Sequence, residues 1–359
     1  MNSQQMELTP NEELMREIEE ERKTIKTDRM DISFGEIINM YKANEIIINP
    51  EYQRAFRWSQ DKQTAFIESI LLGIPFPPIF VIEDKNNVWE LVDGLQRISS
   101  ILAFFGELSD EEKNNLTLVA GDLIKKLDGF NISSLPKKYA LSIKRATCRV
   151  EIIRAGSDLD MRYELFKRLN TGGEELSRQE IRNCIFRSYG NELYEFVNKL
   201  SQKPLFQQYI KISEMQIEKK YYQELVLRYL SLKNNMNFDG QLQDHMDKYL
   251  LMITKNKKLN IQEEEIIFDK ILDKINSFNL PEIFKLNTLK FSTSVFDALF
   301  INFGRYNEKI DAITAQEIES MKNDNEFRKN TGPASSSQYR VPKRIERAAE
   351  VLRLVKDDK

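Results

Sequence analysis

Residues 91–97 (Leu-Val-Asp-Gly-Leu-Gln-Arg) combine residue types that together can hold a phosphate. An apolar stretch ends at Asp93, and a helix is expected to begin at Gly94. Asp93, Gln96 and Arg97 then stand at positions i, i+3 and i+4, so they project from one side of the helix start. The first backbone N–H groups of the helix and the guanidinium point toward the same place. The alternative is an ordinary helix start, with Asp93 as its cap and Arg97 in solvent.

Two residues give this motif further chemistry. The Asp93 carboxylate could bind Mg²⁺ directly or through water, and Gly94 lets a ligand approach the backbone closely. The chain has no Walker A pattern, no G-x-G-x-x-G pattern and no pair of Cys or His residues at metal-binding spacing. A nucleotide site in this chain must therefore be of another kind.

A second group of polar residues lies in the segment 50–54 (Pro-Glu-Tyr-Gln-Arg), followed by Trp58. It stands between an expected strand and an expected helix. Arg54 could form a fork to a phosphate, and the Gln53 amide could contact a base or a ribose. The alternative is that Arg54 pairs with a neighbouring carboxylate and that Trp58 is a core residue.

A third group is formed by residues 166–173 (Phe-Lys-Arg-Leu-Asn-Thr-Gly-Gly). A helix end, a Gly-Gly loop and a new helix start follow one another there. The loop, with Asn170, Thr171 and Gly172, could fold over a nucleotide, and Arg168 and Asn170 would supply polar contacts. The alternative is a connector whose glycines only close the turn.

The hydrophobic pattern predicts the elements that position these groups. Strands are expected at 46–48, 79–82, 88–92 and 147–153, and helices at 33–41, at 59–72, from 94, at 158–169 and from 177. Ser177 and Glu180 form a capping box, and Leu176 and Ile181 occupy the positions of a hydrophobic staple. Beyond Arg187 the pattern is helical only, with helices expected at 191–200, 220–233, 241–254, 262–277 and 294–303, and a last helix that starts near Pro342.

This order predicts an α+β protein, in which a small mixed-sheet core is followed by an all-helical domain. We expect an acidic helical arm at 1–30, a nucleotide-binding domain at 31–187 and a helical domain at 188–359. A length of 359 residues, with 41 % hydrophobic and 30 % charged residues, suits such a division. No stretch approaches the roughly 20 apolar residues of a membrane span, and the polar N-terminus resembles no signal peptide, so we expect a cytoplasmic protein without membrane contact.

His245 is the single histidine of the chain, and Cys148 and Cys184 are the two cysteines. One imidazole excludes His-dependent nucleases of the HNH type and zinc hydrolases within this chain. We interpret His245 as a partly exposed helical residue, and both cysteines as small core residues in a reducing compartment.

Taken in this order, the three groups resemble the GmrSD restriction-enzyme N-terminal domain family, which has a ParB/sulfiredoxin-like fold and is common in bacterial defence genes. The resemblance covers roughly residues 30–190. The residues that carry it are Tyr52-Gln53-Arg54 with Trp58, Asp93-Gly94-Leu95-Gln96-Arg97, Arg168 to Gly173, and Leu176-Ser177 to Glu180-Ile181-Arg182-Asn183.

The resemblance implies a nucleotide-binding core that uses a nucleoside triphosphate and Mg²⁺. In restriction relatives the Asp93-to-Arg97 motif is tied to NTP hydrolysis coupled to recognition of modified DNA. Many members have glutamine where Leu95 stands here. Restriction members often continue into an HNH-like nuclease domain, so this chain is expected to be a stand-alone member that acts with a separate effector such as a nuclease. ParB relatives also suggest a homodimer.

We therefore expect a nucleotide-binding, NTP-hydrolysing sensor or regulatory component of a prokaryotic anti-phage, restriction-type defence system. In this hypothesis Arg54, Arg97 and Arg168 bind phosphates, Gln53 and Gln96 position the ribose, base or attacking water, and Asp93 binds Mg²⁺. The alternative is a non-enzymatic, antitoxin-like or DNA-binding partner protein, with the acidic arm as its interaction segment. Residues 326–356 contain eight Lys and Arg against three Glu, so DNA could bind the helical domain; a solvated amphipathic helix explains the same pattern.

Overall fold

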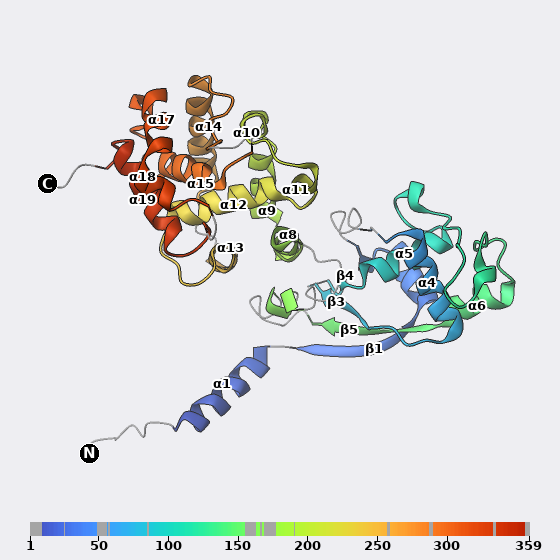
Figure 1. Ribbon diagram of the computed structural model, residues 1–359. Helices are drawn as coiled ribbons and strands as arrows, with labels where there is room; N and C mark the ends of the chain where they lie inside the picture. Colours follow the sequence, from blue (N-terminus) through green and yellow to red (C-terminus); the bar gives the residue numbers. More distant parts are fainter. Residues whose placement is uncertain are drawn as a thin grey trace, which may run out of the picture. The chain divides into compact units, whose positions relative to one another are not determined.

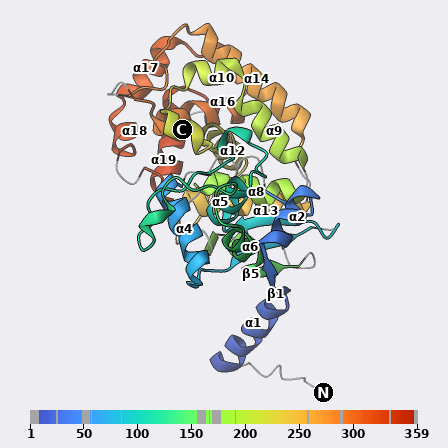
Figure 2. The same cartoon turned by 90° about the vertical axis from the view of Figure 1, so that its right-hand side faces the viewer.

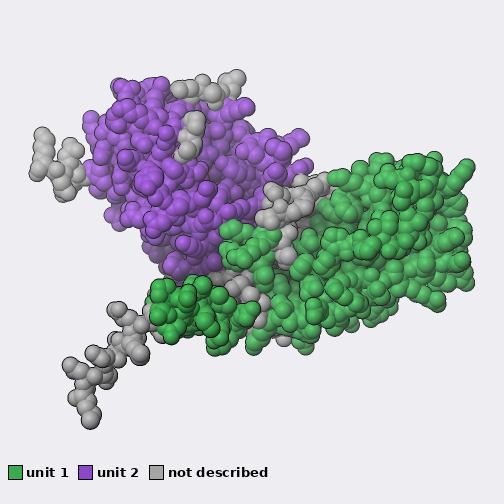
Figure 3. All heavy atoms as spheres, turned by 60° about the horizontal axis from the view of Figure 1, so that its bottom comes forward, with its two compact units in different colours: residues 1–175 green, residues 176–359 purple. Residues whose placement is uncertain are grey.

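A computed structural model of the chain describes residues 9–24, 26–48, 56, 58–84, 86–154, 163–165, 167–168, 177–189, 191–256, 259–286, 290–332 and 335–355. The chain divides into two compact units, residues 1–175 and 176–359 (Figure 3). The first domain expected from sequence ends at residue 187, whereas the first compact unit ends at residue 175. The difference is one helix, α8, which packs on other helices of the second unit.

The first unit contains a five-stranded mixed sheet with the strand order β1-β5-β3-β4-β2. Neighbouring strands alternate between antiparallel pairs (β1 with β5, β3 with β4) and parallel pairs (β5 with β3, β4 with β2). The strands are β1 (Thr27–Ser33), β2 (Ile46–Ile47), β3 (Ile79–Glu83), β4 (Trp89–Asp93) and β5 (Thr147–Ile153).

Strands β2 to β5 confirm the strands expected from sequence, and β3 and β4 form an antiparallel pair. Strand β1 is an additional finding, because its first five residues are exposed and its sequence shows no apolar alternation. Pairing with β5 defines it instead, along the full register from Thr27 opposite Ile153 to Ser33 opposite Thr147. The sheet therefore begins inside the segment expected to be a charged arm.

Helices of the first unit pack together beside the sheet, whereas α1 continues outward from the start of β1 (Figures 1 and 2). Ser33 and Ser59 cap α2 and α4, because each side chain accepts a hydrogen bond from the backbone N–H three residues on. The helices are α1 (Pro10–Thr24), α2 (Phe34–Lys42), α4 (Gln60–Leu72), α5 (Leu95–Phe105) and α6 (Lys137–Arg145), with short 3-10 turns at Glu111–Lys113 and Lys125–Leu127.

The described part of the second unit is helical, as the periodicity predicted. Its core is a cluster of aromatic rings around Phe300, which contacts Phe206, Tyr229, Phe268, Phe284 and Phe296. The elements are α8 (Arg178–Tyr189), α9 (Asn191–Ser201), α10 (Pro204–Tyr209), α11 (Glu214–Glu218), α12 (Tyr221–Asn234), α13 (Leu242–Asn256), α14 (Ile261–Ser277), α15 (Thr293–Phe296), a π-helical turn (Asp297–Ile301), α16 (Asn302–Arg305), a 3-10 turn (Ile310–Ala312), α17 (Ala315–Asn323), α18 (Asn325–Lys329) and α19 (Arg340–Val351).

Candidate functional site at the start of helix α5

The junction between β4 and α5 is built on Gly94. Its φ of +95° is a left-handed conformation that side-chain-bearing residues rarely adopt. A Cβ at this position would lie 2.5 Å from Ile79 Cγ2 on the adjacent strand β3. The glycine therefore brings the start of α5 directly against the sheet, and the side on which a Cβ would lie faces Ile79. The next residue, Leu95, is buried.

Among the described residues, no side chain caps α5. The first-turn N–H groups of an α-helix have no partner within the helix, so an uncapped start leaves donors for water or for an anion. Asp93 is close by but does not cap the helix. The structure therefore differs from an ordinary helix start in which Asp93 is the cap. Its carboxylate accepts a hydrogen bond from Arg97 instead.

Arg97 forms hydrogen bonds that connect the start of α5 to Asp93 at the end of β4 and to the loop before β3. Its Nη2 donates to Asp93 Oδ2 at 2.9 Å and to the Pro78 carbonyl at 3.2 Å, and its Nη1 donates to the Pro77 carbonyl at 3.0 Å. Its side chain is 12 % exposed, against 35 % for Asp93. Arg97 is therefore not solvated. It holds the loop before β3 and orients a half-exposed carboxylate at the end of β4.

Gln96 points toward a different segment. Its Oε1 accepts a hydrogen bond from the backbone N–H of Trp58 at 3.1 Å. The Trp58 carbonyl in turn accepts from Gln63 Nε2 at 2.9 Å, and the Trp58 ring packs edge-on against Phe66. Trp58 is thus held by hydrogen bonds at both its N–H and its carbonyl. The adjacent motif residues Gln96 and Arg97 bind different parts of the chain, the segment before α4 and the loop before β3.

Cys148 lies in the core of the same unit, on β5. The side chain is 1 % exposed, and burial raises the pKa of its thiol to about 11. The thiol therefore stays protonated and behaves as the core residue expected from sequence.

The structure describes only some of the other expected site residues. Arg168 is exposed, and its Nε lies 3.9 Å from Glu164 in a short helical segment. Gln53, Arg54, Asn170, Thr171 and Gly172 lie outside the described residues, as does the side chain of Cys184. Whether they approach Asp93 and Arg97 stays a prediction.

Residues 34–187 match the family model described as GmrSD restriction endonuclease, N-terminal domain. This segment belongs to that family. The match confirms the resemblance drawn from the three motifs, and the family suggests a restriction-type, defence-related protein. No curated protein and no solved structure matches the chain. Within the described residues, no helix is both long and apolar enough to span a membrane.

The GmrSD N-terminal segment ends within helix α8, which begins with the capping box predicted at Ser177. Ser177 Oγ accepts from the Glu180 N–H at 3.2 Å, and Glu180 Oε2 accepts from the Ser177 N–H at 2.8 Å. These two hydrogen bonds start α8, the first described helix after the third motif.

Arg182, which belongs to the same family motif, is fully buried in α8. It donates to Asp247 at 2.6 Å, to Gln179 at 3.1 Å and to the Gln243 side chain at 2.7 Å. Asn183 donates to Gln223. These motif residues therefore form a buried polar network between α8, α12 and α13. Sequence reasoning missed it because the partners lie some 40 to 65 positions away.

The basic segment 326–356 offers fewer cations than its sequence suggests. Arg344 is fully buried and paired with Asp297, and Arg347 pairs with Asp324 and Glu350. Arg328 and Lys329 also bind nearby groups of the chain. Lys343 and Arg353 are exposed. Most of the local positive charge thus stabilises the fold of the second unit.

His245 is buried rather than partly exposed, with 8 % of its surface accessible, and its ring stacks on Phe238 at 5.1 Å. Burial is the main cause that lowers its pKa. In the described part of the chain, no group of three or more His, Cys, Asp or Glu side chains is arranged to hold a metal ion. A metal at Asp93 would therefore need ligands other than a protein cage, such as phosphates and water.

Proposed function

We propose that the GmrSD N-terminal segment binds a nucleoside triphosphate at the start of α5, and that the chain acts as an NTP-dependent sensor or regulator of restriction-type defence together with a separate effector. The observation that carries the proposal is the uncapped start of α5 beside the half-exposed Asp93 carboxylate. Backbone donors for phosphate and an oxygen ligand for Mg²⁺ meet there.

The proposed roles follow from the contacts. Asp93 is the Mg²⁺ ligand: one of its oxygens accepts from Arg97, and the other accepts no hydrogen bond from the described residues. Mg²⁺ suits such a site because it usually takes one or two carboxylates and completes its shell with phosphate and water. Arg97 positions Asp93. Three of the five N–H groups of its guanidinium donate to Pro77, Pro78 and Asp93, which leaves two N–H groups. The same hydrogen bonds orient the remaining N–H on Nη1, which would donate to a phosphate.

Gln96 positions the segment that precedes α4. Arg54 is four residues from Trp58 in the sequence, so the chain itself keeps their Cα atoms within about 14 Å of each other. Fixing Trp58 on Gln96 therefore limits how far Gln53 and Arg54 can be from the start of α5. This is a physical reason to assign the groups around Arg54 and Asp93 to one nucleotide site, and we assign Arg168 and residues 170–172 to it because they belong to the same family motif. Turnover of the nucleotide would use Asp93, Gln96 and Arg97.

Isothermal titration calorimetry of the full chain with ATP, GTP, CTP and UTP, with and without Mg²⁺, tests this proposal. We expect Asp93→Asn to weaken Mg²⁺-dependent binding at least about tenfold, because it removes the charge that holds the ion. The matched control is Asp31→Asn, since Asp31 also forms an ion pair with an arginine, Arg149, in the same unit. Absence of binding in the wild type, or an equal effect of both substitutions, would reject the site.

A non-enzymatic, antitoxin-like or DNA-binding role is the second candidate. The exposed acidic helix α1 favours it, because all of its described side chains are accessible to a partner. In that case the chain should retain a partner protein or DNA equally well with and without nucleotide, and Asp93→Asn should have no effect on retention.

A further inference from the structure

Helix α1 lacks the packing that normally stabilises a helix. Every described residue from Thr9 to Lys23 is exposed. Local contacts within the helix include hydrogen bonds between Thr9 and Glu12 and an ion pair between Arg16 and Glu20. Isolated helices of about 15 residues are marginal in water, so a helix of this length gains most of its stability from a surface on which it packs.

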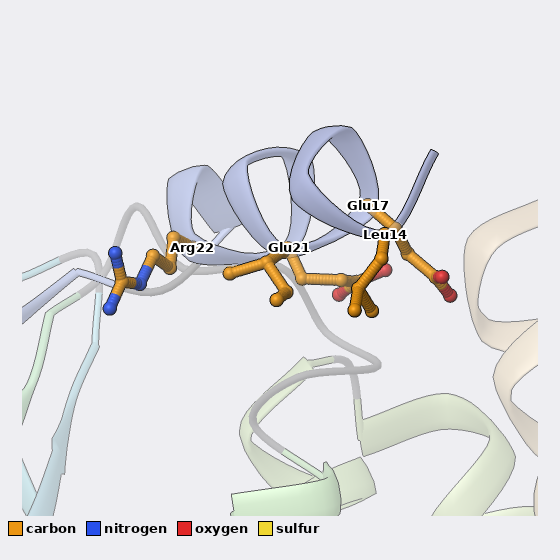
Figure 4. A pocket seen from close by; sticks show the side chains of 5 residues that line it. Leu14, Glu17, Glu21 and Arg22 are labelled. Atoms are coloured by element: carbon orange, nitrogen blue, oxygen red, sulfur yellow. The ribbon is translucent and has the colours of Figure 1, made fainter. Parts of the chain in front are cut away.

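One side of α1 is suited to such packing. Leu14, Met15 and Ile18 are 54 %, 62 % and 45 % exposed, which is unusual for large apolar side chains close together. A hollow on this side of the helix is lined by Leu14, Glu17, Ile18, Glu21 and Arg22 (Figure 4). The helix carries six glutamates against three cations. It therefore presents an apolar strip with an acidic border.

Helix α6 has the complementary surface. Lys137, Lys138, Lys144 and Arg145 are all exposed, and the helix has no acidic residue. Among the described residues, none of the four forms an ion pair with a carboxylate. Lys137 and Arg145 stand one turn before and one turn after Leu141, which is 38 % exposed.

Two of the four charges of α6 do not serve the helix itself, whereas Lys144 and Arg145 lie in its last turn, where the helix dipole favours cations. Lys137 and Lys138 lie in its first turn, where the helix dipole disfavours cations, and no side chain caps that end. A local arrangement that costs stability points to a role outside the element. An apolar residue between cations on α6 matches an apolar strip between glutamates on α1.

The two helices are attached to opposite ends of one strand. α1 precedes Thr27, the first residue of β1. Ser33, the last residue of β1, caps α2, which packs against α6. A strand of seven residues spans about 23 Å, so the acidic strip and the basic face belong to separate ends of the unit. A second copy of the chain can bring them together twice, once in each direction, as a two-fold symmetric interface requires.

We propose that α1 of one copy docks on α6 of a second copy, and α6 of the first receives α1 of the second. Leu14 and Ile18 then cover Leu141, and Glu17 and Glu21 face Lys137 and Arg145. This dimer does not depend on the nucleotide site, because it is formed by other residues and is measured without nucleotide.

Sedimentation-velocity ultracentrifugation of the full chain over a wide range of concentration tests the dimer. We expect a reversible monomer–dimer equilibrium that Glu17→Lys/Glu21→Lys weakens at least about tenfold, and Lys137→Glu/Arg145→Glu by a similar factor, through like-charge contacts. The matched control, Lys343→Glu/Arg353→Glu, reverses two exposed cations of the second unit and should leave the equilibrium unchanged. Circular dichroism checks that each variant is folded.

Mixing the two interface variants gives the decisive result. Each variant alone is repelled from itself in both halves of the interface. In the mixture, the lysines introduced on α1 of one chain oppose the glutamates introduced on α6 of the other, and the second half of the interface keeps its original charges. A heterodimer should therefore form.

Two outcomes overturn the proposal directly: a monomeric wild type at all concentrations, or no heterodimer from the mixture. A monomeric wild type whose DNA binding is abolished by Lys137→Glu/Arg145→Glu also overturns it, because that result would assign this face to phosphate backbones.

Discussion

The side chain of Gln96 accepts a hydrogen bond from the backbone N–H of Trp58 at 3.1 Å, across 38 positions of the sequence. Trp58 is half-buried, and its carbonyl is bound by Gln63. The bond connects two motifs that are related in the sequence only by their resemblance to one family. It also shows how one residue of the Asp93-to-Arg97 motif acts through the backbone of another segment.

This bond should protect the Trp58 amide from hydrogen exchange. A net contribution of about 1–1.5 kcal/mol for such a bond corresponds to roughly tenfold slower exchange. We expect Gln96→Ala to speed exchange of the peptide that contains Trp58 by about that factor, as measured by mass spectrometry. Gln96→Glu is the control because it keeps an acceptor oxygen. Equal exchange in the wild type and in Gln96→Ala would show that the bond is not formed in solution.

Substitution of Gly94 should cost more than substitution of another glycine with a similar backbone. Gly94→Ala combines a left-handed backbone, which costs about 1–3 kcal/mol, with overpacking against Ile79, which adds a similar amount. Gly73→Ala is the matched control, since Gly73 also has a positive φ but no heavy atom within 4 Å of the added Cβ. Urea unfolding monitored by circular dichroism compares the two.

A second substitution separates the two causes. Ile79→Ala removes the Cγ2 atom that a Cβ at position 94 would meet, so Gly94→Ala should cost less in that background than in the wild type. If Gly94→Ala and Gly73→Ala are equally destabilising, the approach of Ile79 has no energetic weight.

The buried charges around Asp297 predict unequal effects for its partners. Asp297 is fully buried and binds Arg228 through two hydrogen bonds of 2.5 and 2.6 Å, and Arg344 as well. Asp297→Asn leaves two buried guanidinium groups without their counter-ion, so the free energy of unfolding of the second unit should fall by about 3–5 kcal/mol. Thermal unfolding measures this loss.

Arg344→Met is the informative comparison. Burial and the neighbouring Arg228 cation lower the pKa of Arg344 although Asp297 raises it, and its buried Nε donates to no described acceptor. Removal of this arginine leaves the Arg228–Asp297 pair balanced, so we expect a loss below about 1.5 kcal/mol. A larger loss than that of Asp297→Asn would contradict the view that the second arginine is the surplus charge.

His245 should make the second unit sensitive to acid. Burial lowers its folded-state pKa below the value of about 6.5 in an unfolded chain, and Lys248 lowers it further. A lowered pKa contributes stability above pH 6.5, and this contribution is lost as pH falls through the folded pKa. His245→Gln should remove this part of the pH dependence, which urea unfolding at several pH values measures. Because His245 is the single histidine, its NMR titration reports the pKa directly.

The sequence was sufficient for most local structure. The capping box at Ser177 and the apolar periodicity act over a few residues, and the strands expected at 46–48, 79–82, 88–92 and 147–153 and the helices expected at 33–41 and 59–72 are present. The family could also be recognised, because motif order is a property of the sequence alone. Strand β1 could not be predicted, because its exposed residues are ordered by pairing with β5, more than 110 positions away.

The roles of charged residues needed the tertiary structure. Arg97, Arg182 and Arg344 read alike in sequence as cations near a motif or in a basic segment. Folding binds the first to Pro77, Pro78 and Asp93, and encloses the other two with Asp247 and Asp297. A guanidinium is taken out of water only where carboxylates or carbonyls replace the lost hydration, and those partners come from distant parts of the chain. The sequence by itself thus determined most of the elements, the family and the position of the Asp93-to-Arg97 motif. The tertiary structure alone decided strand β1 and which cations of the chain support the fold.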